Sequence, residues 1–179
     1  MRKAVFLDRD GLINQGAPPH DYIRRAEDFV FLPNAREAIR ALNDAGFLVF
    51  VVTNQRGVAR GMMTLAEVDR IHRAMLDGLS EIGARIDGVF VCPHDVGACE
   101  CRKPDIGLFL EAERLYPVDR ARSWMVGDSP SDSEAGRRYG VRTIVTGDLM
   151  KAAEIILADD DGVEALSSER MTINGDGLS

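Results

Sequence analysis

Short apolar segments alternate with longer amphipathic segments along most of the chain. Five short segments are mostly apolar, at residues 4–7, 47–52, 88–91, 124–126 and 141–145. Runs of this kind are typical of strands buried on both faces, as in a parallel sheet covered by helices. Between them, apolar residues recur at helical spacing in the segments 35–42, 68–79, 106–115 and 132–139. The alternation predicts an α/β fold: a three-layer, Rossmann-like domain with a mainly parallel central sheet.

Residues typical of helix ends flank several amphipathic segments. Thr64 and Ser131 are each followed three residues later by Glu, which is the spacing of a capping box, so we expect helices to begin there. Gly46 and Gly140 stand where two helices are expected to end. One face of the second amphipathic segment carries Val68, Ile71, His72, Met75 and Leu79.

The regular pattern ends near Ala158. We expect residues 1–158 to form one domain, with a flap at about 12–31. Residues 159–179 contain three consecutive aspartates and a final Asn-Gly-Asp-Gly, so we expect them to be partly disordered. The connections between the expected strands are too short for a separate cap domain, which predicts an open site.

Composition and charge narrow the classes of function. Of the 179 residues 45% are hydrophobic and 28% are charged, which is ordinary for one globular domain. The 22 basic and 29 acidic side chains give a net charge of −7, which argues against a broad nucleic-acid surface. No apolar run approaches the roughly 18 residues of a membrane span, and Asp8 interrupts any signal-type segment. We expect a cytoplasmic monomer that binds neither nucleic acid nor membrane.

Polar residues follow the expected strands, where ligands bind to parallel sheets. Asp8 and Asp10 follow the first strand, and extended backbone would project both side chains to the same side. Two such carboxylates repel each other unless a cation lies between them or one stays protonated, which suits a metal-bound nucleophile beside a general acid. A polar turn built from Asp and Gly is the alternative interpretation.

Three later segments add candidate groups. Thr53-Asn54-Gln55 follows the second strand and offers a hydroxyl and backbone N–H groups to a phosphate. Asp128 and Asp132 follow the 124–126 strand. Lys103 lies in the chain between these two segments and suits charge neutralisation on a phosphoryl group. An exposed charge at a helix start is the simpler alternative.

The three cysteines cluster with a histidine. Cys92, His94, Cys99 and Cys101 supply three thiolates and one imidazole within a loop at 92–101, a donor set typical of a closed tetrahedral zinc site. Four protein ligands favour a structural zinc over a catalytic one, and a disulfide would leave one thiol over. Such a loop would fix Arg102 and Lys103 at the mouth of the site.

The order of these motifs resembles the haloacid dehalogenase (HAD) superfamily of phosphotransferases. Its four motifs are matched by Asp8-x-Asp10-Gly11, Thr53, Lys103 and Gly127-Asp128-x-x-x-Asp132. The resemblance spans nearly the whole chain. It implies a HAD-like fold and a magnesium-dependent phosphatase, a hydrolase that acts through an aspartyl-phosphate.

The resemblance also implies a role for each matching residue. Asp8 would be the nucleophile and Asp10 the general acid and base. Thr53 and Lys103 would stabilise the transferring phosphoryl group. Asp8, the backbone carbonyl of Asp10, and Asp128 would bind magnesium, an ion that prefers oxygen ligands; Asp132 would lie behind them.

Longer strings resemble one branch, subfamily III, of that superfamily. They are Phe6 to Asn14, Val51 to Gly61, and the segment from Cys92 to Pro104. This branch contains phosphatases of D-glycero-D-manno-heptose 1,7-bisphosphate and of histidinol phosphate. The resemblance to this branch implies a role in carbohydrate metabolism, with a small phosphorylated metabolite as the substrate. The leading candidate is the heptose bisphosphate, which would lose its 7-phosphate, and histidinol phosphate is the alternative.

Expected substrate contacts come from two loops and the second strand. Arg102 would suit a second anionic group, whereas Ser129 stands where heptose-bisphosphate phosphatases commonly carry Lys. The expected contacts are Asn54, Gln55, Arg102, His20, Asp21 and Tyr22.

An alternative function of another class is a non-catalytic module whose zinc loop binds a partner protein. The joint presence of the motif residues argues against it.

Overall fold

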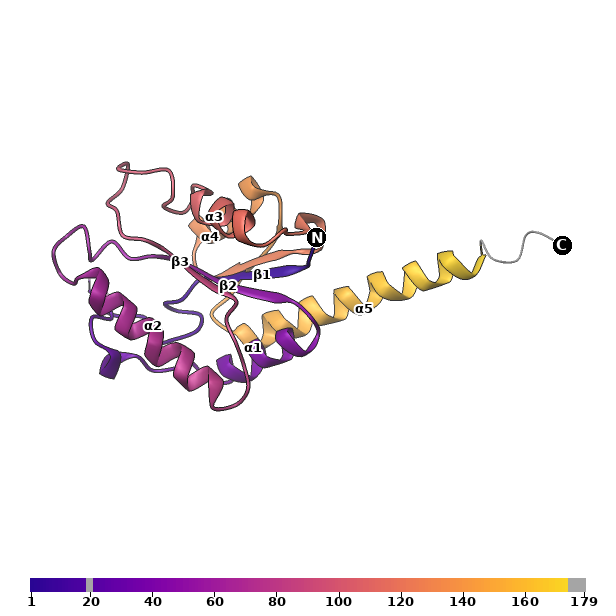
Figure 1. The fold of residues 1–179 in the computed structure, drawn as a ribbon, viewed down its shortest axis with the longest axis horizontal. Coiled ribbons are helices and arrows are strands. Elements are labelled where there is room, and N and C mark those ends of the chain that lie inside the picture. Colours follow the sequence, from indigo (N-terminus) through magenta and orange to yellow (C-terminus); the bar gives the residue numbers. More distant parts are fainter. Residues whose placement is uncertain (19–20, 174–179) are drawn as a thin grey trace.

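A five-stranded parallel sheet forms the centre of the molecule (Figure 1). The computed structural model describes residues 1–18 and 21–173, and residues 163–173 by their backbone alone. The strands lie in the order β3-β2-β1-β4-β5, and every neighbouring pair is parallel. Their bounds are β1 Ala4–Leu7, β2 Leu48–Asn54, β3 Gly88–Cys92, β4 Trp124–Gly127 and β5 Arg142–Val145.

Helices cover both faces of this sheet. On one face lie α1 (Ala35–Asp44), α2 (Leu65–Ser80) and the start of α5 (Leu149–Ile173), and on the other lie α3 (Gly107–Leu115) and α4 (Pro130–Tyr139) (Figure 1). Two 3₁₀ turns complete the described elements, η1 Ala26–Asp28 and η2 Arg120–Arg122. The α/β prediction is confirmed. In the described part of the chain no separate cap domain interrupts it, and none of the described helices is long and apolar enough to cross a membrane.

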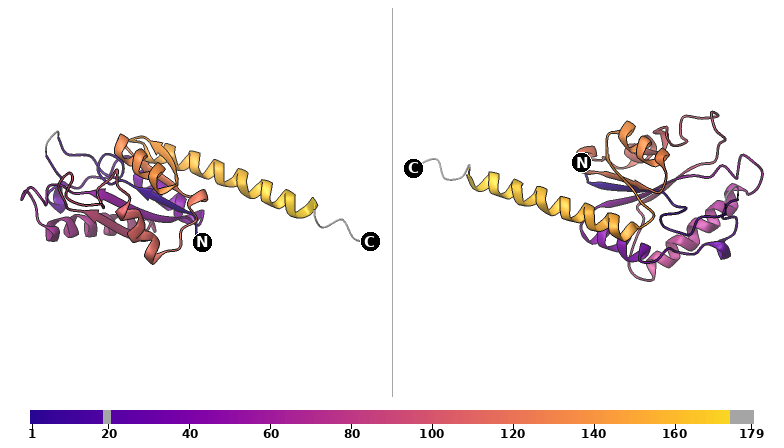
Figure 2. Two further views of the ribbon diagram at one scale, coloured as in Figure 1. Left: turned by 90° about the horizontal axis from the view of Figure 1, so that it is seen from above. Right: turned by 180° about the vertical axis from the view of Figure 1, so that it is seen from behind.

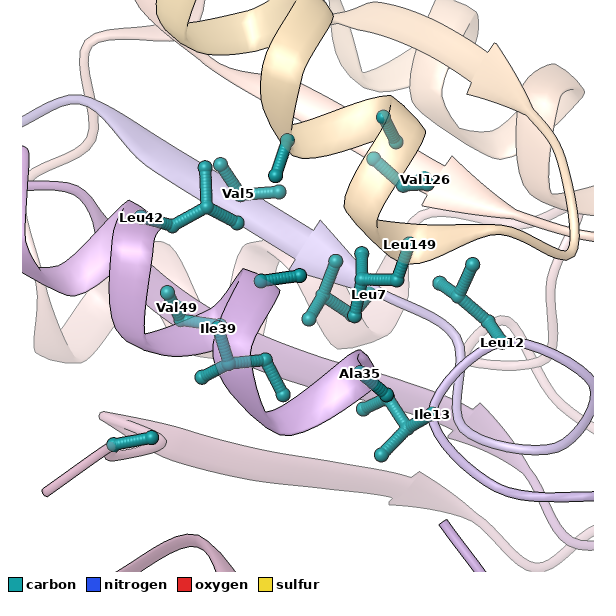
Figure 3. Packing of buried hydrophobic residues seen from close by; sticks show 14 of the residues in the cluster. Val5, Leu7, Leu12, Ile13, Ala35, Ile39, Leu42, Val49, Val126 and Leu149 are labelled. Atoms are coloured by element: carbon teal, nitrogen blue, oxygen red, sulfur yellow. The ribbon is translucent and has the colours of Figure 1, made fainter. Parts of the chain in front are cut away.

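The apolar strand runs fill two cores because side chains alternate across a sheet. Val5 and Leu7 of β1 pack against α1 and α5 (Figure 3). Ala4 and Phe6 point to the other face, where the Phe6 ring lies 4.8 Å from that of Phe109 on α3. Each fully buried side chain of this size contributes about 1.5–3 kcal/mol, so β1 anchors both layers and holds its carboxyl end rigidly.

The helix-end signals at Thr64, Gly46 and Gly140 agree with the structure, and the one at Ser131 does not. The capping box at Thr64 is confirmed, and Gly46 and Gly140 follow helices with φ of +83° and +94°. The predicted start at Ser131 is wrong, because Ser129 caps the helix and pairs with Asp132. Pro130 explains the shift, since proline fits the first helical position and places the cap one residue before it.

Helix α5 continues past the expected boundary at Ala158 to Ile173 and extends beyond the sheet (Figure 2). Asp160 is only 9% exposed and pairs with Lys3 and with Arg122, at 3.0 Å from the latter. A segment that was expected to be partly disordered is therefore helical in its first part, where Asp160 meets one cation from the start of the chain and one from η2. Residues 174–179 lie outside the described residues.

Asp160→Asn is expected to lower the free energy of unfolding by about 1–3 kcal/mol at pH 7, because Lys3 and Arg122 each lose an ion pair with a buried carboxylate. Although burial opposes it, hydrogen bonds from Lys3 and Arg122 hold the pKa of Asp160 below its ordinary value. The contribution is thus present above the unfolded pKa and is lost as pH falls through the folded one. Urea denaturation at pH 7 and below pH 4 measures it; equal differences at both pH values would contradict the ion pair.

Candidate active site

The predicted site residues gather where the carboxyl ends of β1, β2 and β4 lie side by side. Leu7 is in register with Val51 of β2 and Val126 of β4, and the Asp8 N–H donates to the Val126 carbonyl at 2.9 Å. Asp8 therefore leaves the middle of the sheet. The strand order reverses at β1, because β2 lies on one side of it and β4 on the other. Parallel sheets bind ligands beyond the carboxyl ends of the strands at such a point.

A buried ammonium group joins three parts of the site. Lys103 is 3% exposed, and its Nζ lies 2.8 Å from Asp8 Oδ1 and 2.6 Å from Asp132 Oδ1. Although burial opposes it, the charges of Asp8 and Asp132 raise the pKa of Lys103, so the side chain stays cationic. The alternative interpretation of Lys103 as an exposed charge is wrong.

Asp132 is held from its other side by the start of α4. Its Oδ2 accepts hydrogen bonds from the Ser129 N–H at 3.1 Å and from the Ser129 hydroxyl at 2.7 Å. Gly127 leaves room for this carboxylate, since a Cβ there would lie 2.2 Å from Asp132 Oδ2. The helix cap thus aims Asp132 at Lys103.

The carboxylates of this site are too close to be stable as anions alone. One oxygen each of Asp8, Asp128 and Asp132 lies within 4.8 Å of the others. Burial raises the pKa of Asp8 to about 6 despite Lys103, with Asp132 adding to the rise. Burial and then Asp132 also raise the pKa of Asp128.

These residues fit a hard divalent cation. Magnesium bonds oxygen at about 2.0–2.1 Å, so opposite ligands on one ion are about 4 Å apart. Both Asp132 oxygens are engaged, by Lys103 and by Ser129, which leaves Asp8 and Asp128 as the side chains available to an ion. Gly11 leaves room for the Asp128 carboxylate beside Asp10, because a Cβ at residue 11 would lie 2.1 Å from Asp128 Oδ2.

The Asp10 carboxylate points into a set of hydrogen-bond donors. Arg9 Nη2 lies 3.0 and 2.9 Å from its two oxygens, Asn14 Nδ2 lies 2.9 Å from Oδ1, and Gln55 Nε2 lies 2.9 Å from Oδ2. Burial would raise the pKa of Asp10, but Arg9 and these amides hold it below its ordinary value. The Asp10 side chain is thus occupied by these donors. The family resemblance implies that its backbone carbonyl is the group that would bind a cation.

The segment after β2 supports its neighbours. Thr53 is 1% exposed, and its hydroxyl oxygen accepts a hydrogen bond from Gln55 Nε2 at 2.9 Å. The Asn54 amide donates to the Lys103 carbonyl and accepts from the Lys103 N–H, both at 3.1 Å. Gln55 and Asn54, expected as substrate contacts, thus hold Asp10 and Lys103 in place.

The four predicted zinc ligands lie together. The three cysteines are free thiols, and one donor atom from each of the four residues lies within 4.8 Å of the others. Zn–S bonds of about 2.3 Å put tetrahedral sulfurs about 3.8 Å apart. Distances of this order separate the donors: Cys92–Cys99 3.5 Å, Cys99–Cys101 3.2 Å, Cys101–His94 Nδ1 3.3 Å and Cys92–His94 Nδ1 3.7 Å. The donor set therefore fits zinc.

The loop 92–101 leads directly into the site. A cavity of about 320 Å³ is lined in part by Asn54, Arg102, Lys103 and Ser131. The Arg102 Nη1 lies 3.5 Å from the His94 carbonyl, so its guanidinium borders both the loop and the cavity.

Two of the three expected flap contacts, Asp21 and Tyr22, lie in the described part of the chain. Tyr22 packs over Gly57, where a Cβ would lie 3.0 Å from the Tyr22 ring. Asp21 is exposed and accepts from Arg24 Nη2 at 2.5 Å. His20 lies outside the described residues, so its predicted contact stays a prediction.

Several known proteins are similar to this chain in sequence and fold. A HAD-hydrolase-like family model matches residues 100–157. A D-glycero-beta-D-manno-heptose-1,7-bisphosphate 7-phosphatase of Rhodopseudomonas palustris is 47% identical over 148 residues, covering 78% of this chain and 81% of the relative. The enzyme of that name from Haemophilus ducreyi is 36% identical over 168 residues, 89% of each chain. The chain belongs to this family of HAD phosphatases.

A solved structure of the family agrees with the fold. The D,D-heptose 1,7-bisphosphate phosphatase of B. bronchiseptica, complexed with magnesium and phosphate, superposes with a TM-score of 0.76 at 32% identity, covering 88% of this chain and 99% of that chain. The resemblance found in the motifs is thus confirmed, and the protein is a HAD phosphatase, a phosphoric monoester hydrolase.

Three supporting residues of this HAD phosphatase escaped sequence reasoning. Arg9, Asn14 and Ser129 hold Asp10 and Asp132 through the contacts above. For Ser129, the proline that follows it was an available signal of a helix start. For Arg9 the sequence offered none, since an arginine between two aspartates is ordinarily exposed.

Asp132→Asn is expected to lower kcat by about 10- to 100-fold, because Lys103 keeps its place but loses one of two counter-charges. Glu134→Gln on the same helix is the control, since the partners of Glu134 among the described side chains are Arg137 and Arg138 at the surface. Steady-state kinetics and thermal unfolding of both variants measure the effect. A folded Asp132→Asn protein with unchanged kcat would contradict this role.

Proposed function

We propose that this protein removes the 7-phosphate of D-glycero-D-manno-heptose 1,7-bisphosphate, in the β form, through an aspartyl-phosphate at Asp8 and with magnesium. The convergence of Asp8, Lys103 and Asp128 at one sheet edge supports the chemistry. The substrate is the one in the names of relatives up to 47% identical. The expected cytoplasmic location and monomeric state stay predictions.

In the first half-reaction, an Asp8 oxygen attacks phosphorus and the bond from phosphorus to the sugar oxygen breaks. Lys103, 2.8 Å from Asp8, stabilises negative charge on the phosphoryl oxygens, and Thr53 shares this role as the family resemblance implies. Asp10 gives a proton to the leaving oxygen, so the product departs as an alcohol. Asp8, Asp128 and the Asp10 carbonyl would hold magnesium, which would supply positive charge to neutralise the phosphoryl oxygens.

In the second half-reaction, Asp10 takes a proton from water and the water oxygen attacks phosphorus. The Asp8–phosphorus bond breaks, and Asp8 returns as a carboxylate. The donors around Asp10 keep it ionised in the free protein, which is the form that begins this step as a base. For the first step Asp10 must carry a proton, so the incoming phosphate dianion has to offset the effect of Arg9.

Selectivity for a bisphosphate is supported by Arg102. Its guanidinium lines the cavity next to Lys103, where a second phosphate would find a charged, bidentate donor. Histidinol phosphate carries an ammonium group instead, which Arg102 would repel. The non-catalytic alternative has no use for the buried Lys103 between Asp8 and Asp132.

Phosphate release in the presence of magnesium is expected from wild type, with kcat/KM at least about tenfold higher for the heptose bisphosphate than for histidinol phosphate, as one charged contact allows. Asp8→Asn removes the nucleophile and is expected to reduce turnover at least about 1,000-fold. Arg102→Ala should narrow the ratio between the two substrates. A higher kcat/KM for histidinol phosphate would overturn the substrate, and equal turnover in Asp8→Asn would overturn the mechanism.

We further propose a structural zinc in the loop 92–101, with about one equivalent expected by elemental analysis from the single four-ligand set. Cys99→Ser should lose the metal and lower kcat, because the loop carries Arg102 and Lys103 into the site. Glu100→Gln, in the same loop but outside the ligand set, is the matched control. A metal-free preparation with full activity would contradict the proposal.

A further inference from the structure

Arg9 is the largest side chain that is fully buried, at 0% exposure, although it stands between the two aspartates of the first motif. Its Nε and Nη2 donate to Asp10, and its backbone carbonyl accepts from the Ile13 N–H at 2.9 Å. A guanidinium without access to water needs acceptors on its remaining N–H groups. Among the described side chains, one acceptor besides Asp10 meets it.

That acceptor is His72 on α2. Its Nε2 lies 3.1 Å from Arg9 Nη1, and the side chain is 6% exposed. Because a guanidinium only donates, Nε2 must accept, so the ring is neutral and carries its proton on Nδ1. Burial and then the charge of Arg9 lower the pKa of His72 to about 4, in agreement with this assignment.

Packing of α2 against the core holds His72 in place. Ile71 and Met75 are buried neighbours on the same face of α2, and Met75 is part of the core under β1 and β2. The ring therefore forms a rigid stop on one side of the guanidinium while Asp10 lies on the other. A planar guanidinium held at both ends fixes the direction of the carboxylate that it binds.

We propose that His72 is a positioning residue for the reaction: it orients Arg9, which in turn aims the Asp10 carboxylate at the leaving oxygen. This inference rests on the proposed function, in which Asp10 is the general acid and base. Without His72, an N–H of Arg9 loses its acceptor in the core, and the guanidinium must rotate or admit water. Either change moves Asp10, because Arg9 contacts both of its oxygens.

Three His72 variants separate this role from packing. His72→Leu keeps the volume and removes the acceptor. His72→Gln keeps an acceptor oxygen within reach of Arg9, and His72→Asn is polar but too short to reach it. Proton transfer is needed for an alkyl leaving group and scarcely for p-nitrophenolate, so kcat/KM for a sugar phosphate and for p-nitrophenyl phosphate report the position of Asp10 separately.

His72→Leu and His72→Asn are expected to lower kcat/KM for the sugar phosphate by about 10- to 100-fold, part of the gain that general acid catalysis supplies. With p-nitrophenyl phosphate the change should stay within about threefold, as expected when the leaving group needs no proton. His72→Gln should recover at least about half of the wild-type value for the sugar phosphate, since its amide oxygen can accept from Arg9.

Equal losses on both substrates, equal losses in His72→Gln and His72→Leu, or no loss would each overturn the inference. If His72→Leu fails to fold, the pair His72→Asn and His72→Gln decides it alone. Asp10→Asn is measured in parallel. Full activity of that variant would overturn the proposed role of Asp10 itself, whereas its inactivity beside an unaffected His72→Leu would reject only the part given to His72.

Discussion

The buried ammonium of Lys103 is the constraint on which the arrangement of the site depends. A charge removed from water is tolerated only when it is paired, and breaking such a pair is strongly destabilising. Its two partners come from distant segments of the chain, Asp8 after β1 and Asp132 in α4. The Asn54 amide holds its backbone to β2. Lys103 thus ties together the ends of three neighbouring strands and the loop 92–101 that precedes it.

Much of the fold was predictable because its signals are local. Near-continuous apolar runs identified the strands, and helical spacing identified α1 to α4, with boundaries within a few residues of the observed ones. The motif residues were also found, because parallel strands bring the residues that follow them to one edge. The limit of α5 was missed for a physical reason: Asp160 is stabilised by Lys3 and Arg122, partners that no local pattern identifies.

Sequence reasoning also underestimated how the site is supported. It predicted Asn54 and Gln55 as substrate contacts, which stays a prediction, and did not foresee that their amides hold Lys103 and Asp10. Arg9 and His72 form a buried contact between residues 63 positions apart. Such pairs depend on how α2 packs against the sheet, and the side chain types alone would predict exposure for an arginine. Contacts between distant segments are what a single sequence leaves undetermined.

The charge balance at the site explains why a divalent cation belongs there. Asp8, Asp10, Asp128 and Asp132 supply four negative charges, and Arg9 and Lys103 supply two positive ones, so the inner group carries two unbalanced negative charges. Burial raises the pKa values of Asp8 and Asp128, and the neighbouring charge of Asp132 adds to both shifts. A divalent cation would cancel it and keep Asp8 ionised for attack. Because the whole chain carries −7, attraction of an anionic substrate must come from such local groups, including Arg102, and not from the overall field.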